Sequence, residues 1–469
     1  MKVAYFSPMP PETSGIADYS ALLVPALGRR VELTIVRRGA RRPPRGTDLP
    51  LYHIGNDPQA HGWILDALER VPGVVVLHDF VLHHLVSGTT LGRGNSRGYL
   101  DALERDGGLA ARLLGYAVME KRIPALWESR AEELPLAAAV LDRATALIVH
   151  SRYVERRARE TGYENAIHVV PHPAWPAPPV TPAAVAGAPL FGCFGNLNAS
   201  KRIPQLLEAF ARLHRDRPEA RLLLVGGVSP GFDLDRRLQR LGLSGEGIVR
   251  MDYVPEERLW ALMAACDAFV NLRAPTMGET SGSVIRQLSL GKPVVVSDVG
   301  WFSELPDEVA LKIPVDEREV DVLHAALELL SAREDVRVAM GEAAAALARR
   351  EHDLEHVAEL YAAALELAAG GAAVAESVLR DVSRDAAEVG IDAGAPEAVE
   401  LAQRLAEVEL GVCPESGRGG WHATRAARQG RRERRYRLVS ARLRTPHRGA
   451  WRLPAALIHF LDRPLGRRS

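Results

Sequence analysis

Short apolar runs alternate with amphipathic stretches along most of the chain, and the alternation occurs twice. Six apolar runs lie in the first part, at residues 2–6, 31–36, 49–54, 73–78, 146–150 and 167–171. Six more follow, at residues 189–195, 221–227, 248–254, 267–272, 293–300 and 309–314. Amphipathic stretches such as 16–27 and 58–70 separate them. Strands that alternate with helices are typical of parallel, doubly wound sheets, so the pattern predicts two α/β domains.

The two predicted sheets are separated by residues 171–189, which hold seven of the chain's 31 prolines. Proline lacks a backbone N–H, so this stretch is interpreted as an interdomain linker rather than a helix or a central strand. Helical patterns follow the second sheet, at 318–369 and again at 372–410. We expect an N-terminal domain at 1–175, a second domain at 176–350, C-terminal helices at 351–412 and a tail at 413–469. The first C-terminal helix is expected to pack back on the N-terminal domain.

The composition is that of a globular protein of 469 residues, with 47% apolar and 25% charged residues. The net charge is zero, but from Ser416 to Ser469 there are 15 Arg against only Glu433 and Asp462, a net charge of +13, so the remainder carries −13. Such Arg-rich segments bind anionic membranes or nucleic acid. Trp421 and Trp451 favour a membrane surface over nucleic acid. A solvated tail without a partner is the alternative.

The cysteines and the N-terminus bear on the compartment. Cys193, Cys266 and Cys413 are far apart, which indicates neither a disulfide framework nor a zinc site and fits a reducing compartment. The first residues, MKVAYFSPMPP, read as a strand rather than a signal peptide. No apolar run approaches the roughly 18 residues of a membrane span. We expect a cytoplasmic protein, peripheral at the inner membrane face if its tail binds there.

Ligands in doubly wound folds bind beyond the carboxyl ends of the strands, so the loops after strands are the candidate sites. In the loop at 7–20, Gly15 would let the backbone approach a ligand, and the helix that starts there would favour an anion. A plain connecting loop is equally compatible with this stretch. The loop contains no Gly-x-Gly-x-x-Gly, so the fingerprint of nicotinamide dinucleotide binding is absent.

The stretch LHDFVLHH at 77–84 places three histidines and Asp79 after a strand. A metal site is conceivable, but His83 and His84 fall on a predicted helix, away from His78 at the strand end, and this spacing matches no standard zinc pattern. We expect His78 to lie alone in the cleft as a hydrogen-bond donor or proton carrier. A purely structural role is the alternative for His83 and His84.

Two further loops suggest anion binding. Lys201 and Arg202 fall in the predicted first turn of a helix, where each cation costs roughly a few tenths of a kcal/mol against the helix dipole, and a bound diphosphate would offset that cost. A solvated basic pair is the alternative. Ser281–Ser283 are expected to begin a second helix, whose N–H groups form another anion site. Glu279 would repel an anion but suits sugar hydroxyls; the alternative is that it complements the helix dipole.

In their order and spacing these motifs resemble the retaining glycosyltransferases of family 4. The resemblance covers about residues 1–368 and rests on FGNLNASKR, on GETSGSVIRQLSLGKPVVVSDVG and on the YVPEERLWALMAACDAFVNL that precedes it. It implies the α/β fold called GT-B, in which two Rossmann-like doubly wound parallel-sheet domains face a central cleft, here with a C-terminal helical and Arg-rich extension. The N-terminal domain would hold the acceptor and the second domain a nucleotide-sugar donor.

The resemblance also assigns roles to residues. The implied catalytic residues are His78 near the reacting sugar, Lys201 on the donor diphosphate and Glu279 on the donor-sugar hydroxyls. The residues implied in donor binding are Gly15, Asn196, Lys201, Arg202, Tyr253, Val254, Glu279, Ser281, Gly282, Ser283 and Gln287. The residues implied on the acceptor side are Ser14, Asp18, Tyr19 and Asp79.

Two positions depart from the family pattern. The second glutamate of its Glu-x7-Glu motif, which holds the ribose, is replaced by Gln287; counting back from Gly291 instead would place Arg286 there. The family often has an arginine soon after the glycine of the first strand, where this chain has Asn196. Arg202 is the expected substitute, because it lies beside Lys201.

The resemblance implies transfer of a sugar from a nucleoside diphosphate to a hydroxyl acceptor with retention of configuration. The leaving phosphate would help to deprotonate the acceptor, and no metal or other cofactor is expected. The acceptor would be a glycan, a lipid-linked sugar or a small glycoconjugate. The alternatives are a nucleotide-sugar epimerase or hydrolase on the same fold and a non-catalytic assembly protein.

Overall fold

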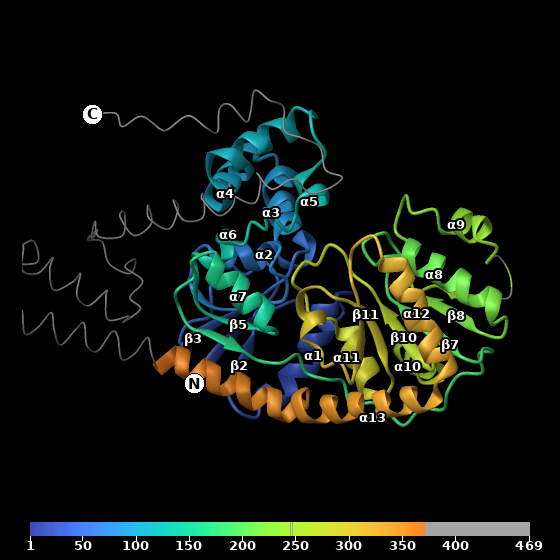
Figure 1. Cartoon of the computed structure of the whole chain (residues 1–469). Coiled ribbons are helices and arrows are strands. Elements are labelled where there is room, and N and C mark those ends of the chain that lie inside the picture. The colour runs from blue at the N-terminus through green and yellow to red at the C-terminus, as the bar shows by residue number, and fades with distance from the viewer. Residues whose placement is uncertain (244, 246, 371–469) are drawn as a thin grey trace, which may run out of the picture.

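The computed structural model describes residues 1–370 except 244 and 246, and it contains two six-stranded parallel sheets (Figure 1). The first sheet has the strand order β2-β1-β3-β4-β5-β6. Its strands are β1 (Lys2–Phe6), β2 (Glu32–Ile35), β3 (Leu49–Ile54), β4 (Gly73–Leu77), β5 (Ala144–Val149) and β6 (Ile167–Val169). The second sheet has the order β12-β11-β10-β7-β8-β9. Its strands are β7 (Leu190–Phe194), β8 (Arg221–Val225), β9 (Ile248–Met251), β10 (Ala268–Asn271), β11 (Val294–Ser297) and β12 (Ala310–Ile313).

Helices connect most successive strands within each domain, although β2 leads to β3 without a helix and β11 leads to β12 through a 3₁₀ turn. Those of the first domain are α1 (Gly15–Leu27), α2 (Pro58–Leu68), α3 (His83–Thr90), α4 (Ser96–Met119), α5 (Leu126–Ser129), α6 (Ala138–Leu141) and α7 (Arg152–Glu160). Those of the second are α8 (Ile203–Asp216), α9 (Leu234–Arg240), α10 (Glu256–Ala265), α11 (Gly282–Ser289), α12 (Glu319–Ala332) and α13 (Glu334–Glu351). Short 3₁₀ turns lie at η1 (Leu91–Arg93) and η2 (Gly300–Glu304). The predicted fold class is therefore confirmed.

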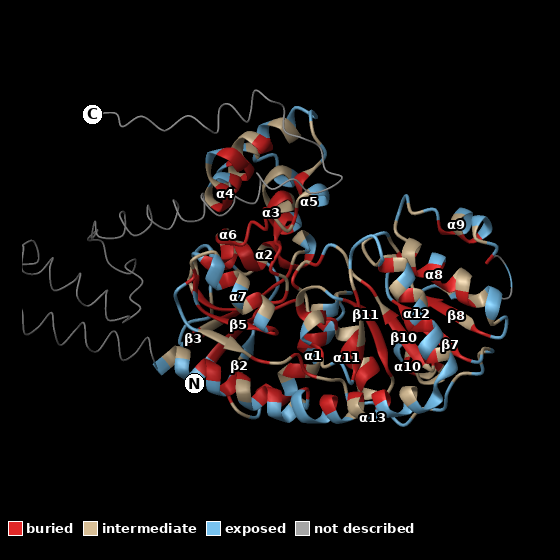
Figure 2. Cartoon of the chain, in the orientation of Figure 1, coloured by how far each residue is buried: buried red, intermediate tan, exposed pale blue. Residues whose placement is uncertain are grey.

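Burial explains why the strands are continuous apolar runs rather than alternating ones. Every residue of β4 and of β7 is buried, because helices cover both faces of each parallel sheet. Figure 2 shows the buried residues concentrated on the strands and on the inner faces of the helices. The carboxyl ends of the strands in each sheet lead into the loops that carry the candidate site residues.

The chain passes between the domains twice. Residues 171–187 contain no helix or strand, as their prolines predict, and lead from β6 to β7. After α13, residues 354–370 are helical and return to the first domain. Val357, Tyr361 and Leu365 of this helix are fully buried in one core with Val3 and Tyr5 of β1. The returning helix is thus one wall of the first domain.

Some predictions concern parts outside the described residues. The helical pattern at 372–410, Cys413 and the Arg-rich segment from Ser416 all lie there. Among the described residues, Cys193 and Cys266 are buried free thiols. None of the described helices is long and apolar enough to cross a membrane.

Candidate active site

Lys201 lies at the carboxyl end of β7, before α8 rather than inside it. The helix begins at Ile203, so the prediction that Lys201 and Arg202 occupy its first turn is wrong. The Lys201 ammonium donates to the Phe194 carbonyl at 2.8 Å. A Cβ on Gly195 would lie 2.4 Å from that ammonium nitrogen, so only glycine permits this approach. Burial, and next the charge of Arg273, lower the pKa of Lys201 to about 8.

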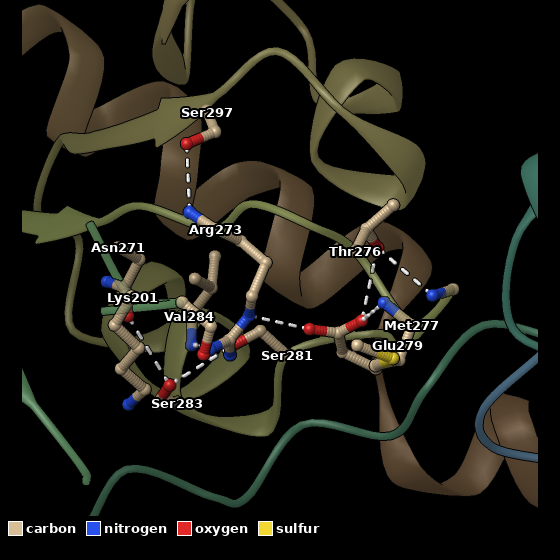
Figure 3. A network of polar contacts seen from close by, with 12 residues as sticks. Lys201, Asn271, Arg273, Thr276, Met277, Glu279, Ser281, Ser283, Val284 and Ser297 are labelled. Carbon is tan, nitrogen blue, oxygen red and sulfur yellow. Dashed lines mark hydrogen bonds and ion pairs between the residues drawn. The ribbon is translucent and has the colours of Figure 1, made fainter. Parts of the chain in front are cut away.

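Arg273 is the second cation of this site, and the sequence analysis did not single it out. It follows β10, and its backbone N–H donates to Ser297 Oγ at 2.8 Å, which fixes the loop to the end of β11. Its Nε forms an ion pair with Glu279 Oε1 at 2.6 Å. Figure 3 shows the Arg273 side chain extending between Glu279 and the serines at the start of α11. A cation directly after a predicted strand was the signal available in the sequence.

Arg202 does not supply the second cation. It adopts the left-handed conformation with φ 54° ahead of α8. Its Nε donates to Glu319 Oε1 at 2.8 Å, and Glu319, at the start of α12, is 2% exposed. This pairing joins α8 to α12, which corrects the expectation that Arg202 substitutes for the arginine that the resemblance implies.

Glu279 is held by its own loop. Its Oε2 accepts from the Met277 N–H at 2.7 Å and from Thr276 Oγ1 at 3.1 Å, while Oε1 faces Arg273 (Figure 3). Gly278 adopts φ 82°, which this tight turn requires. The carboxylate is therefore fixed in position beside the two cations.

The start of α11 completes the anion-binding side of the site. Ser281 is its N-cap, and its hydroxyl lies 3.4 Å from the Val284 N–H and 3.0 Å from the Ser283 hydroxyl. Gly282 leaves room for the Trp175 ring, which a Cβ there would approach at 3.2 Å. The first amides of a helix have no partner within the helix, so this end attracts an anion. Lys201, Arg273 and Glu279 surround the same point.

Of the two residues considered for the ribose position, Gln287 is buried and Arg286 is partly exposed. Gln287 is 0% exposed, and its Oε1 accepts from Asn271 Nδ2 at 2.5 Å. The other amide atom, Nε2, is buried without a hydrogen-bond partner among the described residues. The Arg286 guanidinium stacks 3.8 Å from the centre of the Trp175 ring. The expectation of a ribose contact from Gln287 is not met in this structure.

Asp79 meets the second domain directly. Its Oδ2 accepts from the Asn56 N–H at 2.8 Å. Burial, and next the charge of Glu279, raise the pKa of Asp79 to about 7. The N–H groups of Phe80 and Val81 donate to the Met277 carbonyl at 2.8 and 2.9 Å, so this loop is bonded to the Glu279 loop across the domain boundary.

His78 belongs to a buried group of rings. Its Nε2 lies 3.0 Å from His53 Nδ1, and His53 Nε2 is buried without a partner among the described residues. An unpartnered acceptor nitrogen costs less than an unpartnered N–H, so His53 donates through Nδ1 and His78 accepts. His78 then carries its proton on Nδ1. Burial is the main cause that holds the pKa of both rings well below the usual value, so both are neutral at pH 7.

The other acceptor-side residues lie together at the start of α1, where the Asp18 N–H donates to the Ser14 carbonyl at 3.2 Å, but their side chains have different surroundings. Tyr19 is buried, and its hydroxyl lies 2.6 Å from that of Tyr361, so it faces the returning helix. Ser14 caps α1 by accepting from the Ala17 N–H at 3.0 Å. Asp18 is exposed overall; partial burial of its carboxyl raises its pKa, and the charge of Arg286 in the second domain opposes that rise.

The remaining predicted residues differ in burial. Gly15 and Asn196 are exposed, and Tyr253 is 88% exposed, whereas Val254 packs partly against the core of the second domain. His83 is buried between Tyr99 and the Leu134 carbonyl, as expected for a structural residue. Within the described part of the chain, no group of three or more His, Cys, Asp or Glu side chains is arranged to hold a metal ion.

Residues 188–347 match the family model described as "Glycosyl transferases group 1". No curated protein sequence matches the chain. Sucrose-phosphate synthase from Thermosynechococcus elongatus superimposes with a TM-score of 0.54 at 17% identity, covering 76% of this chain and 96% of its own. The structure of Anabaena HepE in complex with UDP-glucose superimposes with a TM-score of 0.53 at 16% identity. The match covers 78% of this chain and 99% of the HepE chain.

The likeness to the solved structures extends over both domains, whereas the family model covers only the second. Lys201, Arg273, Glu279 and the start of α11 all lie inside the matched range. Most of the second domain therefore matches the glycosyl transferase group 1 model, and the two-domain arrangement of the chain is that of the GT-B fold.

Proposed function

We propose that this protein transfers a sugar from a nucleoside diphosphate to an acceptor hydroxyl, with retention of configuration and without a metal. The observation that carries the proposal is the fixed group of Lys201, Arg273 and Glu279 at the start of α11. Two cations and helix amides suit a diphosphate, and an adjacent carboxylate suits sugar hydroxyls. The group 1 domain and the UDP-glucose named for Anabaena HepE support the same donor class.

The chemistry follows from that arrangement. As the bond from the anomeric carbon to the diphosphate oxygen breaks, its electron pair leaves with the diphosphate. Lys201, Arg273 and the α11 amides would stabilise that growing charge. Glu279 would hold the sugar by its hydroxyls, and His78 would donate a hydrogen bond from Nδ1. The acceptor oxygen then attacks from the face that the diphosphate leaves, and its proton passes to a diphosphate oxygen.

We propose that Asp79 acts on the acceptor side. It lies in the first domain, close enough to Glu279 for the charge of that carboxylate to raise the pKa of Asp79. With a pKa of about 7 it can accept a hydrogen bond from an acceptor hydroxyl when ionised and donate one when protonated. A lipid-linked acceptor would bring the enzyme to the inner membrane face, where the Arg-rich segment from Ser416 would bind anionic lipid.

The first experiment is a thermal-shift titration with UDP, GDP, ADP, CDP and dTDP. Stabilisation grows with ligand concentration relative to the dissociation constant, at about 2.7 kcal/mol for a 100-fold excess. We expect one nucleotide to stabilise the wild type but neither Lys201→Ala nor Arg273→Gln. Lys2→Ala, which changes an exposed lysine at the start of β1, is the matched control and should behave as wild type.

The outcomes separate the alternatives. A nucleotide that stabilises all four proteins equally would place the donor elsewhere and overturn the site. No shift with any nucleotide would favour a non-catalytic assembly protein. Once the nucleotide is known, incubation with its sugar conjugates distinguishes a transferase from an epimerase or hydrolase, because the latter two need no acceptor. NMR of the anomeric proton in the product then tests retention.

A further inference from the structure

A polar hollow of about 560 Å³ opens on the first domain, away from the site described above. It is lined by Arg41, Asp66, Glu69, Arg70, Arg93, Arg105, Ala139 and Arg143. Helix α2 begins just after β3, at the carboxyl ends of the strands, where the candidate site lies. It ends near the amino ends of the strands, where β4 starts. Asp66, Glu69 and Arg70 lie at that far end. The hollow is therefore a separate surface from the nucleotide site.

The lining is suited to an anion and to little else. Five guanidinium groups face two carboxylates, which leaves three positive charges, and Ala139 is the only apolar side chain. Most small-molecule pockets are predominantly apolar, so this one would not hold an apolar ligand. Its volume is within the usual range for a small ligand. Guanidinium groups bind phosphate oxygens in a bidentate manner.

Part of this charge is already compensated within the protein, and part is not. Arg93 donates to Asp66 at 2.9 Å, and Arg105 donates to Asp142 at 2.8 Å. Arg41 and Arg70 are exposed and have no side-chain hydrogen bond or ion pair with any described residue. Arg41 belongs to RRGARRPPR at 37–45, which contains five arginines and no acid. Two uncompensated guanidinium groups thus face a hollow whose other arginines are held in place.

We propose that this hollow binds a multiply charged phosphate group. The chemistry is the same whether the group belongs to a soluble phosphate ester or to the headgroup of an anionic phospholipid. Binding is carried mainly by Arg41 and Arg70, with Arg93 and Arg105 held by their carboxylates as a rigid floor. The inference does not depend on the proposed transferase activity.

Isothermal titration of the full chain with sodium tripolyphosphate tests the proposal. The wild type should bind tripolyphosphate at this hollow and at the nucleotide site, in addition to any binding by the Arg-rich segment from Ser416, which all the variants share. The double variant Arg41→Gln/Arg70→Gln should lose one site, whereas Lys201→Ala should lose the other. None of the substituted residues forms an ion pair with a carboxylate of the described part of the chain. Both variants are therefore expected to fold. Arg45→Gln/Arg240→Gln removes two exposed arginines outside the hollow and should bind as the wild type does.

The remaining arms identify the source of the phosphate and keep the proposal falsifiable. If the double variant binds phosphatidylglycerol vesicles at least 10-fold more weakly than the wild type and the Arg45→Gln/Arg240→Gln control, all of which keep the Arg-rich segment from Ser416, and none of them binds phosphatidylcholine, the ligand is a headgroup. Tripolyphosphate binding without vesicle binding indicates a soluble ester. If the double variant binds tripolyphosphate with the stoichiometry and affinity of the wild type, the proposal is wrong. Nucleotide stabilisation of the double variant should be unchanged, so the two proposals fail separately.

Discussion

Arg202 and Arg273 each lie in a loop that follows a strand, but their side chains have different environments in the structure. Arg202 is bonded to the buried carboxylate of Glu319, whereas Arg273 lies beside Lys201 and Glu279. The sequence places both in loops after strands, and a neighbouring lysine made Arg202 the more obvious choice. The difference depends on Glu319, which lies 117 residues from Arg202. Contacts at that separation are set by the packing of α12 against α8 and not by any local pattern.

Substituting each arginine separates the two roles. Arg273→Gln should weaken binding of the nucleotide that stabilises the wild type by about 10- to 100-fold, because a charge-assisted hydrogen bond contributes about 1.5–3 kcal/mol. Arg202→Gln should leave that affinity unchanged but lower the free energy of unfolding by about 3 kcal/mol, since it leaves Glu319 without its cation. Isothermal titration and urea denaturation measure the two effects. Weaker nucleotide binding in the Arg202 variant alone would reverse the assignment.

The raised pKa of the Asp79 carboxyl should contribute a decrease in the free energy of unfolding as the pH rises. Its pKa is raised to about 7 in the folded protein, so the unfolded chain releases the proton at lower pH than the folded one does. The contribution of the protonated carboxyl is complete below about pH 4 and is lost by about pH 7, a change of up to about 4 kcal/mol. Asp79→Asn should therefore gain stability relative to the wild type over that interval in urea denaturation. The exposed Asp252→Asn is the control and should track the wild type; parallel curves for both variants would contradict the prediction.

At the scale of elements, the hydrophobic pattern predicted the twelve strands and their connections, because parallel strands buried on both faces are short continuous apolar runs. It also predicted that Glu279 and Ser281–Ser283 lie at the start of a helix. It could not predict that Gln287 would turn into the core toward Asn271, or that Trp175 of the linker would stack on Arg286. Both depend on how α11 is rotated against β10 and the linker.

The contact between α11 and α13 depends on glycine. A Cβ on Gly341, inside α13, would lie 2.2 Å from the carbonyl oxygen of Gly291, just after α11. Helix propensity alone predicts that Gly341→Ala stabilises by about 1 kcal/mol. We expect the opposite, a loss of about 2–4 kcal/mol, because the two backbones must separate. Thermal and urea denaturation give the sign. Ala339→Gly, at an exposed position of the same helix, should cost about 1 kcal/mol by propensity alone.

For the whole molecule, a buried group of histidines makes the fold sensitive to acid. Burial is the main cause that holds the pKa of His61 and His150 at about 4 and those of His53, His78 and His172 well below the usual value. The unfolded chain binds protons near pH 6.5, and the folded protein does not until lower pH. These five histidines therefore lower the free energy of unfolding as the pH falls from about 6.5 toward 4, and together they outweigh the opposite contribution of the single Asp79.

The slope of that loss can be measured. Each neutral imidazole contributes about 1.4 kcal/mol per pH unit in the interval where only the unfolded chain is protonated. His150→Phe should reduce the slope of unfolding free energy against pH by about that amount between pH 6 and 4.5. Urea denaturation across this range provides the curve. A slope equal to that of the wild type would mean that His150 is protonated in the folded protein.

The helix at residues 354–370 has a consequence for how the protein is made. Tyr361 meets Tyr19 across 342 residues of sequence, and the core around β1 lacks one wall until that helix arrives. During synthesis the first domain emerges from the ribosome long before the segment that completes it, while the second domain has its own core. We therefore expect the domain that is translated first to complete its folding last. One apolar side of that domain stays uncovered until residues 354–370 have been synthesised.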